Sequence, residues 1–121
     1  MAVRFDSSVR LRSRAQFTAV QEDGRRVSSR FFTVLARPNT TGKDRLGLVA
    51  SRRLGGAVTR NRAKRRLRAA FRLLPDAVRP EGASSLDVVV IARREIIEAS
   101  FAALESELQS ALARLRRMRV K

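Results

Sequence analysis

Apolar residues recur at helical spacing near both ends of the chain. They predict a short helix over residues 14–22 and a longer one over residues 100–116. The apolar positions are Phe17 and Val20 in the first helix and Phe101, Leu104, Leu108, Ala111 and Leu115 in the second. Capping residues flank these segments, namely Ser13, Gln16 and Gly24 around the first and Ser100 before the second.

A third helical stripe lies in the most basic part of the chain. Its apolar members, at i, i+4, i+7, i+8 and i+11, are Ala63, Leu67, Ala70, Phe71 and Leu74. Because each residue of a helix rotates by about 100°, four polar side chains fall on the opposite side: Asn61, Arg65, Arg68 and Arg72. One face of this helix is therefore predicted to pack and the other to display positive charge.

Three apolar runs predict strands, at residues 31–36, 45–51 and 86–92. Turn-forming residues 38–42 join the first two runs, which are expected to pair as a hairpin. In the second strand the positions that share one face are Leu46, Leu48 and Ala50. Gly47 leaves room on the other face of that strand, and the strongly apolar third strand is expected to be central.

The order helix, strands, helix, strand, helix predicts an α+β fold. We expect a two-layer sandwich with a small mixed sheet of about four strands and three helices, in one domain over residues 1–121 with a frayed basic tail from about residue 116.

The apolar runs are too short to cross a bilayer, and no apolar signal-peptide region is seen before Arg14. The absence of cysteine permits a reducing compartment, so a cytoplasmic protein is expected.

Charge indicates what such a domain binds. The chain has 27 Lys and Arg against 11 Asp and Glu, a net charge of +16, and ten basic residues without a carboxylate between Asp44 and Asp76. Like charges stand four apart in the basic helix, as in Lys64 and Arg68, and each such pair destabilises an isolated helix by roughly 0.2–0.5 kcal/mol. A polyanionic partner explains this better than a merely solvated face. Nucleic acid is favoured over anionic membrane, because the apolar stripe lacks the Trp of interfacial helices.

The available residue types argue against catalysis by the polypeptide alone. The chain has no histidine and no cysteine, and its carboxylates are scattered. Two close acidic pairs are Glu95 with Glu98 and Glu105 with Glu107, for which a solvated surface is favoured over a metal site. We therefore expect neither a catalytic residue nor a metal ligand in the protein.

The turn before the basic helix is a further candidate for anion binding. Gly55 and Gly56 lack the spacing of a known phosphate loop. Arg52, Arg53 and Arg60 nevertheless surround this turn, where free backbone N–H groups favour anions. The aromatic residues that could stack on a base are Phe17 and one of Phe31 or Phe32, although a place in the core is the favoured interpretation of each.

Residues 51–68, with Arg60, Asn61 and Arg62 at their centre, closely resemble the signature of the bacterial ribonuclease P protein component. The resemblance extends to Arg10, Leu11, Phe17, Val20 and Gly24 near the N-terminus and to the late strand over residues 88–93. Membership implies a small basic subunit that binds a large catalytic RNA, the two together removing the 5′ leader of precursor tRNA. It also implies that the RNA performs the hydrolysis with bound Mg²⁺, and no protein partner is expected.

By position, the resemblance implies two groups of binding residues. Those expected to bind the catalytic RNA are Arg60, Asn61, Arg62, Lys64, Arg65, Arg66 and Arg68. Those expected near a cleft for the single-stranded leader are Phe17, Ser51, Arg52, Arg53, Arg60 and Asn61. The family fold further implies a left-handed crossover through the basic helix, where general rules predict a right-handed one.

The sequence departs from the family pattern at a few of these places. Gln21 and Leu35 stand where many relatives have aromatic residues, which predicts weaker base stacking in the cleft. Gly56 stands where Asn or Lys is frequent, which removes a possible contact, whereas Arg52 and Arg53 replace a commoner Lys-Lys and keep the charge.

Composition alone leaves other functions open. The main alternative is a non-enzymatic protein that binds structured RNA, of the ribosomal or RNA-chaperone type. A DNA-compacting protein is less favoured, because neither a dimer seam nor a groove-reading helix is evident. Residues 51–68 and the region around Phe17 are what separate these classes.

Overall fold

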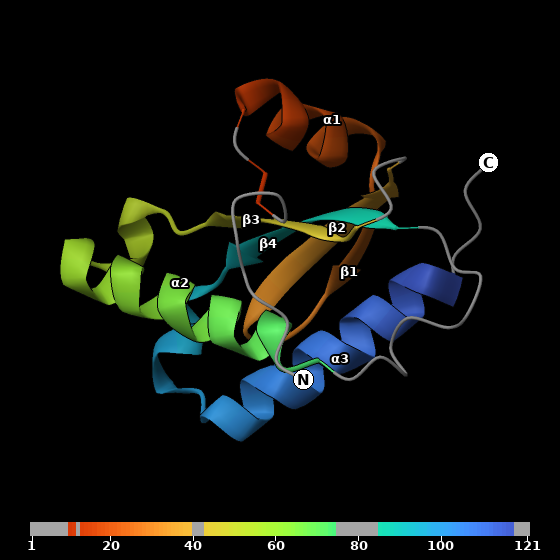
Figure 1. Ribbon diagram of the computed structural model, residues 1–121. Coiled ribbons are helices and arrows are strands. Elements are labelled where there is room, and N and C mark those ends of the chain that lie inside the picture. Colours follow the sequence, from red (N-terminus) through yellow and green to blue (C-terminus); the bar gives the residue numbers. More distant parts are fainter. Residues whose placement is uncertain (1–9, 12, 40–42, 75–84, 118–121) are drawn as a thin grey trace.

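The computed structural model describes residues 10–11, 13–39, 43–74 and 85–117, which form helices on both sides of one sheet (Figure 1). The elements in chain order, with η for a 3₁₀ segment, are α1 (Arg14–Asp23), β1 (Arg25–Ser28), β2 (Phe32–Pro38), β3 (Arg45–Val49), η2 (Arg52–Leu54), α2 (Ala57–Arg72), β4 (Leu86–Ala92), η4 (Arg94–Glu98) and α3 (Phe101–Arg117). The predicted α+β fold with three helices and a mixed sheet is confirmed. The Pro- and Gly-containing stretch from 75 to 84 lies outside the described residues.

The strands are ordered β1-β2-β4-β3, so β4 is central, as its apolar sequence predicts. It runs antiparallel to β2, with Val89 opposite Leu35, and parallel to β3, with Val89 opposite Gly47. The expected hairpin of β2 and β3 is wrong, because β4 lies between these two strands. Helix α2 connects the parallel strands β3 and β4, which gives the expected crossover through the basic helix; its hand stays a prediction.

Strand β1 has no clear signature in the sequence, because Val27 is its only apolar residue. Val27 is also the only residue of this strand that is buried. It forms because its backbone pairs with β2, from Arg25 opposite Ala36 to Ser28 opposite Thr33. A four-residue polar segment of this kind gains its structure from the neighbouring strand rather than from its own side chains.

Helices cover the two faces of the sheet unequally. Helices α2 and α3 lie on one side and α1 on the other, so helices cover both faces of the sheet, whereas a two-layer sandwich has them on one (Figure 1). Val88 and Val90 of β4 belong to the large core under α2 and α3, whereas Val89 belongs to a smaller cluster under α1. Burial on both faces explains why β4 is a continuous apolar run.

The predicted helix caps are present. Gln16 N–H donates to Ser13 Oγ and Ser13 N–H donates to Gln16 Oε1, both at 3.1 Å, which completes a capping box. At the start of α3, Ala103 N–H donates to Ser100 Oγ at 3.1 Å. Gly24 ends α1, and a Cβ there would lie 2.3 Å from Val20 O, so the close approach of the chain requires glycine.

The C-terminal end of α3 lies close to the predicted boundary. Arg116 and Arg117 are helical, so the helix ends one residue beyond the predicted position 116, and the expected fraying of the basic tail stays a prediction. Leu115 is buried in the core, and Arg116 Nη2 donates to Asp44 Oδ2, which ties this turn to the segment before β3. Residues 118–121 lie outside the described residues.

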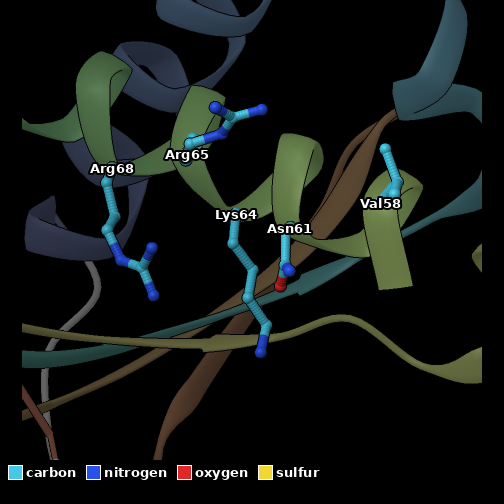
Figure 2. Close-up of a pocket in the computed structure, with 5 residues that line it drawn as sticks. All are labelled: Val58, Asn61, Lys64, Arg65 and Arg68. Carbon is cyan, nitrogen blue, oxygen red and sulfur yellow. The ribbon is translucent and has the colours of Figure 1, made fainter. Parts of the chain in front are cut away.

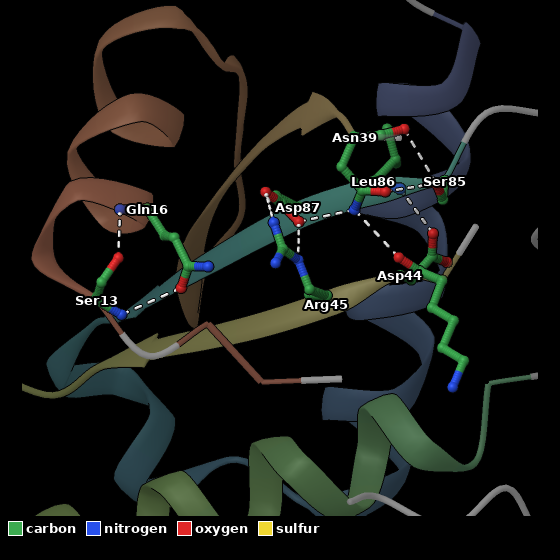
Figure 3. Close-up of polar contacts among 9 residues, drawn as sticks. Ser13, Gln16, Asn39, Asp44, Arg45, Ser85, Leu86 and Asp87 are labelled. Atoms are coloured by element: carbon green, nitrogen blue, oxygen red, sulfur yellow. Dashed lines mark hydrogen bonds and ion pairs between the residues drawn. The ribbon is translucent and has the colours of Figure 1, made fainter. Parts of the chain in front are cut away.

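A polar cluster joins β2, β3 and β4 at one end of the sheet (Figure 3). Arg45 Nε and Nη2 donate to Asp87 Oδ1 and Oδ2, each at 2.7 Å, and Asn39 Nδ2 donates to Asp87 Oδ1 at 2.7 Å. The hydrogen bond and charge of Asp87 raise the pKa of Arg45 above its usual value, against the smaller effect of burial. Ser85 Oγ donates to Asn39 Oδ1, so the cluster fixes the start of β4 against the end of β2.

Candidate nucleic-acid interface

Helix α2 separates a packing face from a charged face as predicted. Ala63, Leu67 and Ala70 are buried, and Phe71 and Leu74 pack against the same core. The N-cap, Gly56, contributes no side-chain hydrogen bond to the first turn. The amide groups of that turn therefore add positive potential to the basic side chains that follow.

A groove along the exposed side of α2 is lined by Val58, Asn61, Lys64, Arg65 and Arg68 (Figure 2). Figure 2 shows Asn61, Lys64 and Arg68 extending to one side of the helix, whereas Arg65 extends in another direction. Val58 is 80% exposed, an unusual position for a large apolar side chain within so charged a surface. The lining holds three cations and no carboxylate, which suits a polyanion.

The N-terminal segment adds a cation, Arg10, which the family resemblance includes but to which it gives no role. Leu11 N–H donates to Leu46 O at 3.0 Å, and Arg10 forms a parallel bridge with Leu46 at the edge of β3. Burial lowers the pKa of Arg68, and the nearby charge of Arg10 lowers it further. Arg10 and Arg68 are therefore close enough to interact, and together they form a basic site beside α2.

Arg66 differs from its neighbours because the protein itself engages it. Its Nη1 donates to Ile96 O at 3.2 Å, and its Nη2 donates to Ala99 O. Burial, and then the charge of Arg62, lower the pKa of Arg66. The guanidinium thus holds the segment before α3, an arrangement that competes with the RNA contact expected for this residue.

Arg60 and Asn61 occupy different sides of α2. Asn61 is exposed, whereas Arg60 is half-buried, seven residues before the buried Leu67 and therefore on the side nearer the sheet. The Nε of Arg60 is buried and has no hydrogen-bond partner in the part of the chain that the structure describes. These neighbours can therefore contact an RNA from two directions.

The turn between β3 and α2 presents two exposed arginines. Leu54 is buried and anchors η2, while Arg52 and Arg53 face solvent. Gly55 closes the turn with φ of 134°, a conformation that side-chain-bearing residues rarely adopt, and its N–H donates to Arg52 O at 3.1 Å. Gly55 therefore serves to shape the turn.

Phe17 lies on the α1 side of the sheet, in a cluster of buried residues comprising Leu11, Val20, Leu35 and Val89. Its ring is half-buried, together with Val49 and Ile91, so part of this apolar surface faces solvent. Phe32 is fully buried in the opposite core, and Phe31 packs against that core as well. The possible pairing of Phe17 with Phe32 is therefore wrong, because the sheet separates them.

Comparison with known proteins accounts for this combination of basic helix and α+β fold. A family model described as Ribonuclease P matches residues 5–116. The chain belongs to the ribonuclease P protein family. It is 42% identical over 106 residues to the ribonuclease P protein component of Roseiflexus sp. (strain RS-1), covering 87% of this chain and 84% of that one.

Solved structures agree with this assignment. The ribonuclease P protein from Thermotoga maritima superposes with a TM-score of 0.73 at 33% identity, over 91% of this chain and 97% of that one. The Staphylococcus aureus ribonuclease P protein gives 0.70 at 30% identity, over 86% and 92%. The chain thus functions as a protein subunit of ribonuclease P, a ribonucleoprotein endoribonuclease of tRNA processing, and associates with ribonuclease P RNA.

The structure of this ribonuclease P protein adds one aromatic residue to the basic surface. A second groove is lined by Arg62, Arg65, Arg66, Ala69 and Phe101. The sequence pattern assigns Phe101 to the core, because it begins the apolar stripe of α3; the contact with α2 depends on tertiary packing and has no local signal.

The described residues contain neither a cluster of potential metal ligands nor a helix suited to spanning a membrane. Within them, no group of three or more His, Cys, Asp or Glu side chains is arranged to hold a metal ion. No helix among them combines the length and apolar character that a bilayer span requires.

Proposed function

We propose that this ribonuclease P protein binds the catalytic RNA through the outer face of α2. The observation that carries this proposal is the carboxylate-free groove containing Asn61, Lys64, Arg65 and Arg68, on the side of the helix opposite the core. Guanidinium groups suit phosphate oxygens because they donate parallel hydrogen bonds. The residues assigned to RNA contact are Arg60, Asn61, Arg62, Lys64, Arg65 and Arg68, and Arg66 is assigned to positioning.

The second part of the proposal is that the α1 side of β3 receives the precursor-tRNA leader. Strand β3 carries Gly47 under the Phe17 ring and leads directly into Ser51 and the exposed Arg52 and Arg53. An accessible aromatic ring and cations presented by one strand and the turn after it are the kinds of group that bind single-stranded nucleic acid. The residues assigned to the leader are Phe17, Ser51, Arg52, Arg53, Arg60 and Asn61.

The protein's proposed part in catalysis is electrostatic. Positive side chains on α2 would neutralise phosphates of the folded RNA, and so lower the Mg²⁺ concentration that the complex needs. Hydrolysis would be performed by the RNA with its bound Mg²⁺. The scattered carboxylates and the absence of His and Cys in the sequence support this division of labour.

The test is cleavage of a precursor tRNA by a bacterial ribonuclease P RNA at low Mg²⁺, with and without the protein. We expect stimulation at the correct site, lost on replacing Arg60 and Asn61 together by Ala. Arg117→Ala, which removes one exposed charge from α3, is the matched control and should stimulate normally. RNA binding without stimulation would favour the non-enzymatic class of structured-RNA-binding protein.

A further inference from the structure

We infer that the groove between α2 and the start of α3 is an additional RNA contact, in which Phe101 stacks on an unpaired base and Arg62 and Arg65 bind its flanking phosphates. This inference rests on the proposed binding of α2 to the catalytic RNA. It adds an aromatic subsite, and with it a preference for an unpaired nucleotide, to a surface otherwise made of charge.

The groove is built from both helices on the same side of the sheet. Its lining comprises Arg62, Arg65, Arg66 and Ala69 of α2 and Phe101 of α3, and these helices lie side by side (Figure 1). Phe101 is half-buried and packs against the main core, so part of the ring is anchored while part lines the groove. A ring held in this way is a preorganised platform that loses little freedom when a base binds.

Arg66 gives the groove its shape. It donates to Ile96 O at 3.2 Å and to Ala99 O, the carbonyls that precede α3. Ala99 is two residues before Phe101, so these bonds fix the first turn of α3 against α2 and hold the ring beside Arg62. Arg66 is thus a positioning residue, and its burial in these contacts explains why it is less available to phosphate.

The charge of the groove selects the ligand. Arg62 and Arg65 are exposed, and the lining contains no carboxylate. The amides of the first turn of α3 add positive potential at the same place. An aromatic ring flanked by guanidinium groups matches a nucleotide whose base is free to stack, whereas a duplex offers only its phosphates.

The groove that contains Phe101 is continuous with the groove along the exposed side of α2, so an RNA bound to α2 can reach it. Arg65 lines both this groove and the one that contains Asn61, Lys64 and Arg68. An RNA bound along α2 therefore passes Arg65 on its way to Phe101. The ligand is accordingly an unpaired nucleotide of the same RNA rather than a separate molecule.

The experiment compares Phe101→Leu with Phe101→Trp in binding to a bacterial ribonuclease P RNA. Leu keeps an apolar side chain in the core but removes the stacking ring, and we expect about tenfold weaker binding, within the range known for base–aromatic stacking. Trp keeps a ring and should bind like the parent. Because the chain contains no Trp or Tyr, the fluorescence comes from the introduced indole alone, and it should be quenched when a base of the RNA stacks on it.

Leu73→Trp is the control for non-specific quenching, since Leu73 is 56% exposed and lines neither groove. Thermal unfolding of each variant confirms that it is folded under the binding conditions. Parent-like affinity of Phe101→Leu, or equal quenching at positions 101 and 73, overturns the inference. If Arg65→Ala with Arg68→Ala weakens binding while Phe101→Leu does not, this subsite alone is wrong; if the parent protein fails to bind the RNA, the proposed function is wrong as well.

Discussion

The ring of Phe17 lies against the backbone of Gly47 in the neighbouring strand β3. A Cβ on Gly47 would come within 2.6 Å of ring carbons Cε1 and Cζ and 3.2 Å from Leu11 Cβ. Among the described residues only Gly55 has a positive φ. Glycine is therefore needed at position 47 for the space it leaves to the ring, and not for its backbone conformation.

Gly47→Ala is predicted to displace the Phe17 ring. The new methyl group cannot coexist with the ring in its present place, so the half-exposed ring must rotate outward. We expect a loss of about 1–2 kcal/mol in the free energy of unfolding, as for a moderately overpacked site, measured by urea denaturation.

The same variant should lower the affinity for precursor tRNA in the holoenzyme. The loss should be large for a substrate with a long leader and absent for mature tRNA, because only the leader is proposed to contact Phe17. Phe17→Leu is the matched comparison and should show the same dependence. Equal losses for the two substrates would separate Phe17 from leader binding.

The space left by Gly47 can be predicted from the sequence because it follows from alternation along one strand. The neighbour that fills this space cannot, because Phe17 reaches it through the packing of α1 on the sheet. The wrong hairpin has a similar origin: the turn after β2 indicates only that the chain reverses, and long-range pairing places β4 between β2 and β3. Local periodicity thus predicts the elements, and tertiary contacts decide their order.

Arg65→Ala and Arg66→Ala are predicted to affect different properties, although the residues are adjacent. Arg66→Ala should mainly lower the stability of the fold, and Arg65→Ala should mainly lower the affinity for RNA. Arg66→Ala removes the hydrogen bonds to Ile96 O and Ala99 O, so it should destabilise the fold by about 2 kcal/mol, the usual value for bonds to a charged donor. Arg65→Ala removes an exposed side chain and should change the stability by less than about 0.5 kcal/mol. Thermal unfolding monitored by circular dichroism measures the difference.

RNA affinity should show the reverse order once each variant is studied well below its unfolding temperature. Arg65→Ala should weaken RNA binding more than Arg66→Ala does, and Arg66→Lys should restore part of the stability that Arg66→Ala loses. Equal stabilities of the two alanine variants would show that the contacts of Arg66 contribute nothing to the fold.

The salt dependence of RNA binding should fall when phosphate contacts are removed. If Arg65 and Arg68 each bind a phosphate, replacing both by Ala lowers the slope of log K against log salt concentration by about 0.7–0.9 for each phosphate that is no longer bound. Arg114→Ala with Arg117→Ala removes the same charge from the exposed end of α3 and should leave the slope unchanged. An unaltered slope in the α2 variant would place Arg65 and Arg68 outside the interface.

The basic surface illustrates what a sequence can and cannot reveal about a site. The charged face of α2 follows from helical periodicity, since Arg65 and Arg68 stand opposite a regular apolar stripe. The different role of Arg66 does not, because its partners, Ile96 and Ala99, are about thirty residues away in the chain. A sequence therefore predicts which side chains are cationic, while the fold decides which of them are free to bind.

Acidic residues of the protein should be dispensable for RNA cleavage. Replacing Glu95 and Glu98 together by Gln removes an exposed acidic pair that the proposal excludes from catalysis. The rate constant for precursor-tRNA cleavage by the holoenzyme at saturating Mg²⁺ should stay within about twofold of the parent value, because neither carboxylate is proposed to lower the activation free energy. A loss of several orders of magnitude would show that the protein supplies a catalytic carboxylate.

Asp87→Ala should be among the most destabilising replacements of a polar residue in this fold. Its carboxylate accepts from Arg45 Nε and Nη2 and from Asn39 Nδ2, each at 2.7 Å, and the Asp87 and Arg45 side chains are 10% and 20% exposed. Removing the anion leaves a largely buried guanidinium without its partner, so we expect a loss of about 3 kcal/mol in the free energy of unfolding. Urea denaturation measures this loss.

The matched control is the pair formed by Arg37 and Asp23, whose nearest atoms are 3.6 Å apart and whose side chains are 38% and 69% exposed. Asp23→Ala should cost less than about 1 kcal/mol, because water already screens that pair. The Asp87 variant, studied cold enough to be folded, should still stimulate precursor-tRNA cleavage, since the cluster lies at the ends of the strands rather than on α2. If the two alanine variants were equally stable, the buried cluster would have no special part in holding β4 between β2 and β3.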